Sequence, residues 1–177
     1  MPMYSQLTRA DIVPKFPIGT EINFPGDDKR GIIYLPVLSS TVAVAVTAGA
    51  CTIGKPGLYL PENKGVEYFG GKTNSDYFNG YMVVGLATAA VGTYCWHQYK
   101  GRVTAVNKDG TAFTAGDVID FESISNTLSR RARNAAIALR STLTQRCQGY
   151  VPVDANYNSA GALSASSTQC SIVLYGW

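Results

Sequence analysis

The stretch from Gly92 to Phe121, GTYCWHQYKGRVTAVNKDGTAFTAGDVIDF, limits the fold of this chain more than any other part of the sequence. Three runs within it are rich in Val, Thr, aromatic and other strand-forming residues, and they predict strands at 93–99, 102–106 and 117–122. The residues Asn107 to Gly110 predict a hairpin turn, since Asn and Gly tolerate positive φ. The pattern indicates an antiparallel β protein.

The rest of the chain continues this pattern of short strands and turns. Further strands are predicted at 31–37, ending at Pro36, and at 41–46, 58–60, 149–153 and 169–177, with a turn at 55–57 and a long loop at 69–80. The 177 residues include 18 Gly and 11 Tyr, and a chain of this length buries roughly 70% of its unfolded surface. We predict a mainly β protein, a small β-barrel or sandwich with one α-helix, forming a single domain over residues 31–177.

Residues 1–30 are different in character. Four prolines fix φ along this segment and favour extended geometry in the residues before them. Apolar side chains lie between the prolines, more of them than a solvated tail carries; they are Ile12, Val13, Phe16, Ile18, Ile22 and Phe24. We predict an extended N-terminal arm that lies on its own domain or on a neighbouring molecule, with a disordered tail as the alternative.

Residues 125–146, SNTLSRRARNAAIALRSTLTQR, contain five arginines and no acidic residue. Small and apolar side chains recur there at spacings of three and four, which predicts the single α-helix; they are Leu128, Ala132, Ala135, Ala136, Leu139 and Leu143. Ser123, Ser125 or Asn126 would cap its start. Ile137 falls on roughly the opposite face, beside arginines.

Three interpretations of this basic helix remain open from the sequence. The arginines face solvent and pair with Asp117, Asp120 or Glu122, or they bind an acidic protein partner, or they bind nucleic acid. Nucleic acid is the least favoured, because the net charge is only +3 and no aromatic residue lies between Phe121 and Tyr150 to stack on bases.

No motif for catalysis or cofactor binding is present. The sequence contains no GxSxG, HExxH, P-loop or dinucleotide fingerprint, so neither an enzyme nor a cofactor is predicted. Cys95 and His97 would share one face of a strand, but such neighbours lie about 6.5–7 Å apart along it, which favours a strand position beside aromatic residues over a Cys–His pair. Asp117, Asp120 and Glu122 lack the ligand spacing of a calcium loop.

The four cysteines, Cys51, Cys95, Cys147 and Cys170, form no CxxC pair, and His97 is the one histidine. We therefore expect no structural zinc site and favour free buried thiols over a disulfide, in a reducing cytosol. The N-terminus shows no signal-peptide pattern, and the most apolar window, 82–92, is too short to span a membrane.

With the strands placed, residues 80–177 show a familiar sequence of elements. The matching parts are Ala89 to Gly92, Gly101 to Val106, Gly110 to Asp117, Gly149 to Val153, and Ile172 to Leu174. In this order they resemble the capsid decoration (cement) proteins of tailed bacteriophages. The basic segment 125–146 replaces a short connection of that pattern, and the first 80 or so residues have no counterpart in it.

The resemblance implies a structural role without catalytic residues or cofactors. It implies a virion protein, made in the host cytoplasm, that binds the capsid exterior, bridges subunits of the major capsid protein of the same virus, and self-associates, with a trimer favoured. It implies no role for nucleic acid or a membrane. Combined with the residue patterns, it predicts partner contacts in the helix, the arm and the 69–80 loop; these residues are Arg130, Arg131, Arg133, Ile137, Arg140, Phe16, Ile18, Phe24, Tyr77 and Phe78.

Three other functions remain as alternatives. A virion module that binds a receptor or carbohydrate would use an aromatic platform of Tyr68, Phe69, Tyr77 and Phe78. A nucleic-acid-binding protein would use the basic helix, with binding that weakens steeply as salt rises. A principal coat protein of a small virus would assemble shells by itself.

Overall fold

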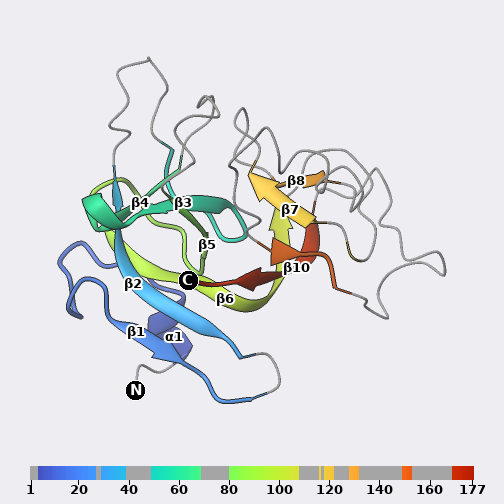
Figure 1. The fold of residues 1–177 in the computed structure, drawn as a ribbon. Helices are drawn as coiled ribbons and strands as arrows, with labels where there is room; N and C mark the ends of the chain where they lie inside the picture. The colour runs from blue at the N-terminus through green and yellow to red at the C-terminus, as the bar shows by residue number, and fades with distance from the viewer. Residues whose placement is uncertain are drawn as a thin grey trace.

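The computed structural model describes residues 4–26, 29–38, 49–68, 80–107, 116, 118–121, 128–131, 149–152 and 169–177. A closed barrel of five strands forms its centre (Figure 1). The strands are β2 (Gly31–Leu38), β3 (Pro56–Leu60), β4 (Gly65–Glu67), β5 (Tyr81–Gly85) and β6 (Tyr94–Asn107). Their order is β2-β4-β3-β5-β6, and pairing of β2 with β6 closes the ring. The prediction of a mainly β protein with a small barrel is confirmed.

The other strands extend this sheet on both sides of the barrel. β1 (Glu21–Asn23) pairs with β2, while β10 (Gln169–Tyr175) pairs with the second half of β6. Beyond β10 follow β9 (Gly149–Tyr150), β7 (Val118–Phe121) and β8 (Leu128–Arg131), away from the barrel in Figure 1. A short helix, α1 (Tyr4–Leu7), and a 3-10 turn, η1 (Pro61–Asn63), complete the described elements.

Strand β6 is the longest element and joins the two parts of the sheet. It runs without a break over 14 residues, where the sequence predicted two strands at 93–99 and 102–106. Gly101, at φ 82°, lies inside it, and the pairing with β2 shifts register between Gly31 and Ile32. A glycine in the left-handed region accommodates such an irregularity without ending the strand, which is why the predicted division into two strands was wrong.

Strand β2 is buried on both faces. Ile33, Leu35 and Val37 belong to a core cluster with residues of β4, β5 and β6, whereas Ile32 and Tyr34 on the opposite face pack with Trp96 and Leu7. Alternation of side chains along a strand separates these two clusters. The N-terminal arm covers the second one, so the arm completes the hydrophobic core of the described protein.

Three contacts hold the arm on the barrel. The backbone of Asp11 pairs with that of Tyr94 through two hydrogen bonds of 2.8 Å, and β1 adds a strand to β2. The Phe16 ring packs against Tyr34 and Trp96, each with a centroid distance of 5.2 Å. The described arm residues therefore lie on their own protein, one of the two arrangements that the sequence allowed, but Tyr4–Leu7 form a helix where an extended chain was predicted.

The predicted helix at 125–146 is wrong where the structure describes it. Leu128–Arg131 form β8, which pairs antiparallel with β7 from Val118↔Arg131 to Phe121↔Leu128. β7 pairs with β9 on one side, so its other edge offers unpaired backbone groups that β8 satisfies. Half of the predicted apolar stripe is alanine, which buries little area, so strand pairing overrides the local periodicity.

Two smaller boundaries also differ from the prediction. The turn expected at 55–57 is formed by Ile53 and Gly54, with the Lys55 N–H bonded to the Thr52 carbonyl, and β3 starts at Pro56. β2 continues past Pro36 to Leu38 because Val37 donates its N–H to Thr93. The predicted strand 41–46 and most of the loop 69–80 lie outside the described residues.

Candidate functional site

A buried cluster of two cysteines and a histidine is the most concentrated chemistry in the described part of the chain. Cys51 lies in an isolated bridge with Ala89, and Cys95 and His97 both come from β6. One side-chain donor atom of each residue lies within 4.8 Å of the other two, and all three side chains are fully buried. Both cysteines are free thiols, as the sequence predicted for them.

Close contacts fix the geometry of this cluster. Sγ of Cys95 lies 3.6 Å from Nε2 of His97, and the Cys51 thiol donates to the Ala87 carbonyl at 3.2 Å. The Tyr68 ring stacks on the imidazole with a centroid distance of 5.9 Å. Gly85 leaves room for the group, since a Cβ there would collide with Cys51 Sγ and lie 2.9 Å from the Tyr68 hydroxyl oxygen.

The two thiols influence each other's ionisation. Hydrogen bonding with the Cys95 thiol lowers the pKa of Cys51, against the opposing effect of burial, and His97 lowers it further. The same hydrogen bond with Cys51, together with burial, raises the pKa of Cys95 well above its usual value. Burial also raises the pKa of the Tyr68 hydroxyl. Cys51 is thus the group of the cluster that most readily becomes a thiolate, the form that binds metals.

Sequence reasoning missed this cluster for two reasons. His97 does occupy a strand position beside aromatic residues, as predicted, but the spacing argument against contact with Cys95 was wrong. Backbone positions two residues apart along a strand are widely spaced, whereas side chains that lean toward each other bring the donor atoms to 3.6 Å. The third member, Cys51, approaches only through the barrel fold, and no local pattern predicts that approach.

A second candidate site is the outer surface of the arm. Ile12 and Val13 are 85% and 71% exposed, and Ile18 is 46% exposed. Asp11, directly before them, is buried and fixed by the Tyr34 hydroxyl at 2.9 Å and by Lys15 at 3.4 Å. The arm therefore presents apolar side chains to solvent from a backbone that is held in place.

The predicted partner residues divide into three groups. Ile18 faces solvent, but Phe16 and Phe24 pack against the protein's own aromatic cluster. Arg130 and Arg131 are placed in β8 by their backbone alone. The remaining residues lie outside the described part of the chain: Arg133, Ile137, Arg140, Tyr77 and Phe78.

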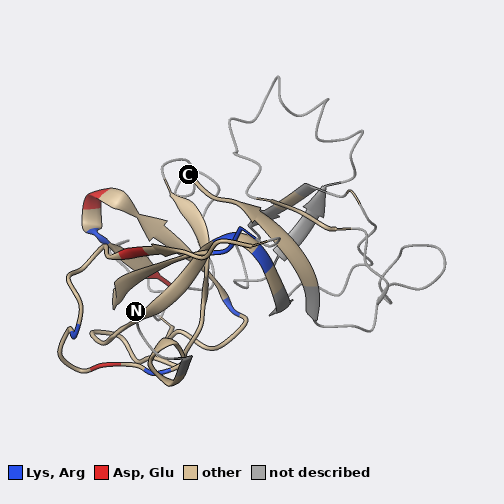
Figure 2. Cartoon of the chain, turned by 90° about the horizontal axis from the view of Figure 1, so that it is seen from below, with Lys and Arg blue, Asp and Glu red and all other residues tan. Residues whose placement is uncertain are grey.

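Two other sites considered from the sequence are an exposed aromatic platform and a cluster of acidic residues. Tyr68 is fully buried beside His97, so it does not belong to an exposed aromatic platform for carbohydrate. The side chains of the proposed acidic cluster, Asp117, Asp120 and Glu122, lie outside what the structure describes. Charged residues on the described ribbon are few and of both signs (Figure 2).

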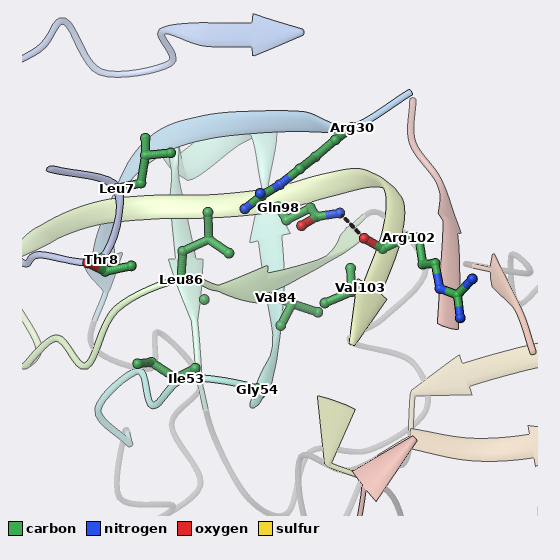
Figure 3. Close-up of a pocket in the computed structure, with 11 residues that line it drawn as sticks. Leu7, Thr8, Arg30, Ile53, Gly54, Val84, Leu86, Gln98, Arg102 and Val103 are labelled. Carbon is green, nitrogen blue, oxygen red and sulfur yellow. Dashed lines mark hydrogen bonds between the residues drawn. The ribbon is translucent and has the colours of Figure 1, made fainter. Parts of the chain in front are cut away.

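An open pocket of about 440 Å³ lies between the start of the arm, the Ile53–Gly54 turn and strands β5 and β6 (Figure 3). Apolar side chains such as Leu7, Val84 and Val103 line it. Gln98 donates to the Arg102 carbonyl at 2.7 Å, and Arg30 extends toward Gln98 with its Nε buried and without a hydrogen-bond partner. The unpaired guanidinium nitrogen suits an acceptor such as a carboxylate.

Comparison of the chain with protein-family models, curated proteins and solved structures finds no match. Among the described residues, no helix has the length and apolar character to cross a bilayer.

Proposed function

We propose that this protein is a structural virion protein that binds the exterior of an icosahedral phage capsid and bridges subunits of the major capsid protein. The observation that carries the proposal is the pair Ile12 and Val13, exposed on an arm whose neighbouring residue Asp11 is buried and bonded to the barrel. The capsid as the partner follows from the resemblance of residues 80–177 to decoration proteins.

The fixed arm favours binding to another protein. Exposed side chains on an ordered backbone lose little conformational freedom when a partner covers them, so more of the buried apolar area contributes to affinity. Ile18 enlarges the same arm's apolar surface. A disordered arm would lose more entropy on binding.

Repetition of weak contacts would provide the affinity that a bridging protein needs. A trimer would present three arms to neighbouring coat subunits, and linked contacts strengthen one another by about 10²–10⁴-fold through effective concentration. The arginines Arg130, Arg131, Arg133 and Arg140 remain predicted contacts to an acidic capsid surface, and Ile137, Tyr77 and Phe78 remain predicted apolar ones.

The test is a density gradient of lysate from infected cells, with the chain followed by quantitative mass spectrometry. We expect it to migrate with assembled heads at a fixed ratio to the major capsid protein. The variant Ile12→Ser with Val13→Ser should fold normally and lose this comigration. Val91→Ser, which changes a 39% exposed valine outside the arm, is the matched control and should still bind.

Two outcomes would contradict the proposal in different ways. A wild-type chain that stays at the top of the gradient, free of particles, would exclude a capsid protein. If the variant with both arm substitutions still comigrates with heads, the contact surface lies outside Ile12 and Val13, and the arginine segment would be the next to substitute.

A further inference from the structure

We propose that Cys51, Cys95 and His97 form a binding site for one zinc ion, or a soft metal ion of the same class, inside the barrel. The three residues come from two segments 44 residues apart in the chain and meet only in the fold. The sequence patterns predict no such site, and the site is independent of the surface by which the protein would bind a capsid.

The distances fit tetrahedral coordination. Zinc–sulfur bonds of about 2.3 Å and zinc–nitrogen bonds of about 2.0–2.1 Å place a sulfur and a nitrogen ligand about 3.5–3.6 Å apart at the tetrahedral angle. Cys95 Sγ and His97 Nε2 lie 3.6 Å apart. Two sulfur ligands would lie about 3.8 Å apart by the same bond lengths, and Cys51 Sγ is within 4.8 Å of both other donors.

The donor set selects the kind of metal. Two thiolates and an imidazole are soft or borderline ligands, typical of zinc or copper(I) and unsuited to magnesium or calcium. Binding would release the thiol protons of Cys51 and Cys95. Because all three side chains are fully buried, the ion would enter during folding rather than by exchange with the native protein.

The Tyr68 hydroxyl is the candidate for a fourth ligand in this proposal. The Tyr68 hydroxyl is buried and has no hydrogen-bond partner, and it adjoins the space beside Gly85 that Cys51 Sγ also borders. Its oxygen would complete the coordination or hold a water that does so. Nδ1 of His97 is also buried without a partner, so the ring is oriented by stacking on Tyr68.

The alternative is that the Cys95–His97 contact is a hydrogen bond in a metal-free core. A hydrogen-bonded thiol at 3.6 Å would leave the Tyr68 hydroxyl and His97 Nδ1 buried without a partner, which is unfavourable for each group. A metal that recruits the Tyr68 oxygen would remove one of these costs, and this favours the metal site.

The test begins with the unsubstituted full-length chain, so it does not depend on the folding of a variant. The protein is unfolded with a chelator present, freed of metal and refolded with Zn²⁺ or with Co²⁺ as a coloured substitute. We expect one zinc per chain after gel filtration, measured by elemental mass spectrometry. The Co²⁺ form should show the visible bands of a tetrahedral ion and a thiolate charge-transfer band.

Substitution then identifies the ligands. Cys51→Ser and Cys95→Ser should each weaken the charge-transfer band, and His97→Gln should reduce the stoichiometry. Cys147→Ser is the matched control, because Cys147 is not one of the three proposed ligands, and it should leave both readouts unchanged.

Three results would overturn the proposal. The first is a folded chain that refolds in Zn²⁺ without retaining it. The second is a Cys51–Cys95 disulfide, found by peptide mapping of the protein purified without reductant from the cells that produce it. The third is a Co²⁺ spectrum that survives loss of both cysteines. None of these readouts uses capsids, so failure here leaves the capsid proposal standing, and the reverse also holds.

Discussion

The Tyr34 hydroxyl donates a hydrogen bond of 2.9 Å to the carboxylate of Asp11, joining a barrel strand to the arm across 23 residues of sequence. Asp11 is only 6% exposed, and Lys15 and Arg9 lie 3.4 and 3.8 Å from its carboxylate. A buried carboxylate supported in this way fixes the arm at one point of the barrel surface.

Replacement of Asp11 by Ala should release the arm. The Tyr34 hydroxyl would lose its acceptor and remain buried, which lowers the free energy of unfolding by about 1–3 kcal/mol. Urea unfolding would measure this loss, and trypsin should cut faster after Lys15. Glu62→Ala, an exposed acidic residue of η1, is the control and should change neither. Unchanged cleavage in Asp11→Ala would show that Asp11 does not hold the arm.

The arm should contain one position that matters for stability and one nearby that does not. Phe16→Ala removes a ring packed between Tyr34 and Trp96 and should lower the free energy of unfolding by about 2–4 kcal/mol. Ile18→Ala removes a side chain that is nearly half exposed and should change it by no more than about 0.5 kcal/mol. Equal losses in urea unfolding would contradict the observed packing of the arm.

Stability should fall as the solution becomes strongly alkaline. Burial raises the pKa of both Tyr34 and Tyr99 to about 12, so the folded protein keeps these phenols neutral after an unfolded chain has lost its protons. Their contribution to the free energy of unfolding is present below about pH 10 and is lost as pH rises toward about pH 12. Urea unfolding at about pH 9 and about pH 11 would measure the slope.

Phenylalanine at these positions provides the comparison. Tyr34→Phe and Tyr99→Phe should each make the free energy of unfolding fall less steeply as pH rises, because one raised pKa is removed from the folded state. Tyr175→Phe, which changes an exposed tyrosine, should leave the slope as it is. A slope that no substitution changes would assign alkaline unfolding to other groups.

Gly85 should tolerate no side chain. A Cβ there would collide with Cys51 Sγ and approach the Tyr68 hydroxyl, so Gly85→Ala should lower the free energy of unfolding by at least about 1–3 kcal/mol. Gly92→Ala, in open space at φ 85°, should cost about 1 kcal/mol from backbone strain alone. Thermal unfolding of the two variants would separate overpacking from strain, and a milder effect at Gly85 would contradict the close packing around Cys51.

The sequence contained enough information for the fold class and for many of the strands. Alternating apolar residues predicted β2, β6 and β10, and Ile172 and Leu174 do lie on one buried face. Local sequence patterns predicted the wrong secondary structure where pairing with a neighbouring strand determines it. Leu128–Arg131 have helical spacing in sequence, yet the open edge of β7 pairs with them as a strand.

The candidate sites were predictable to different extents. The apolar character of the arm was visible in the sequence, and Ile18 is partly exposed, while its role as a partner contact stays a prediction. The inward packing of Phe16 and Phe24 depends on Trp96 and Tyr34, which lie far along the chain. The approach of Cys51 to Cys95 depends in the same way on closure of the barrel, which no local pattern contains.

Strand β6 also determines how this protein would respond to a pulling force. Its 14 residues extend about 45 Å, with β2 bonded along one half and β10 along the other. Tension between the arm and the β7–β10 region, directed along β6, would load both sets of hydrogen bonds in shear. Bonds in shear must break together, whereas bonds peeled from one end break singly, so the molecule would be mechanically strongest along this strand.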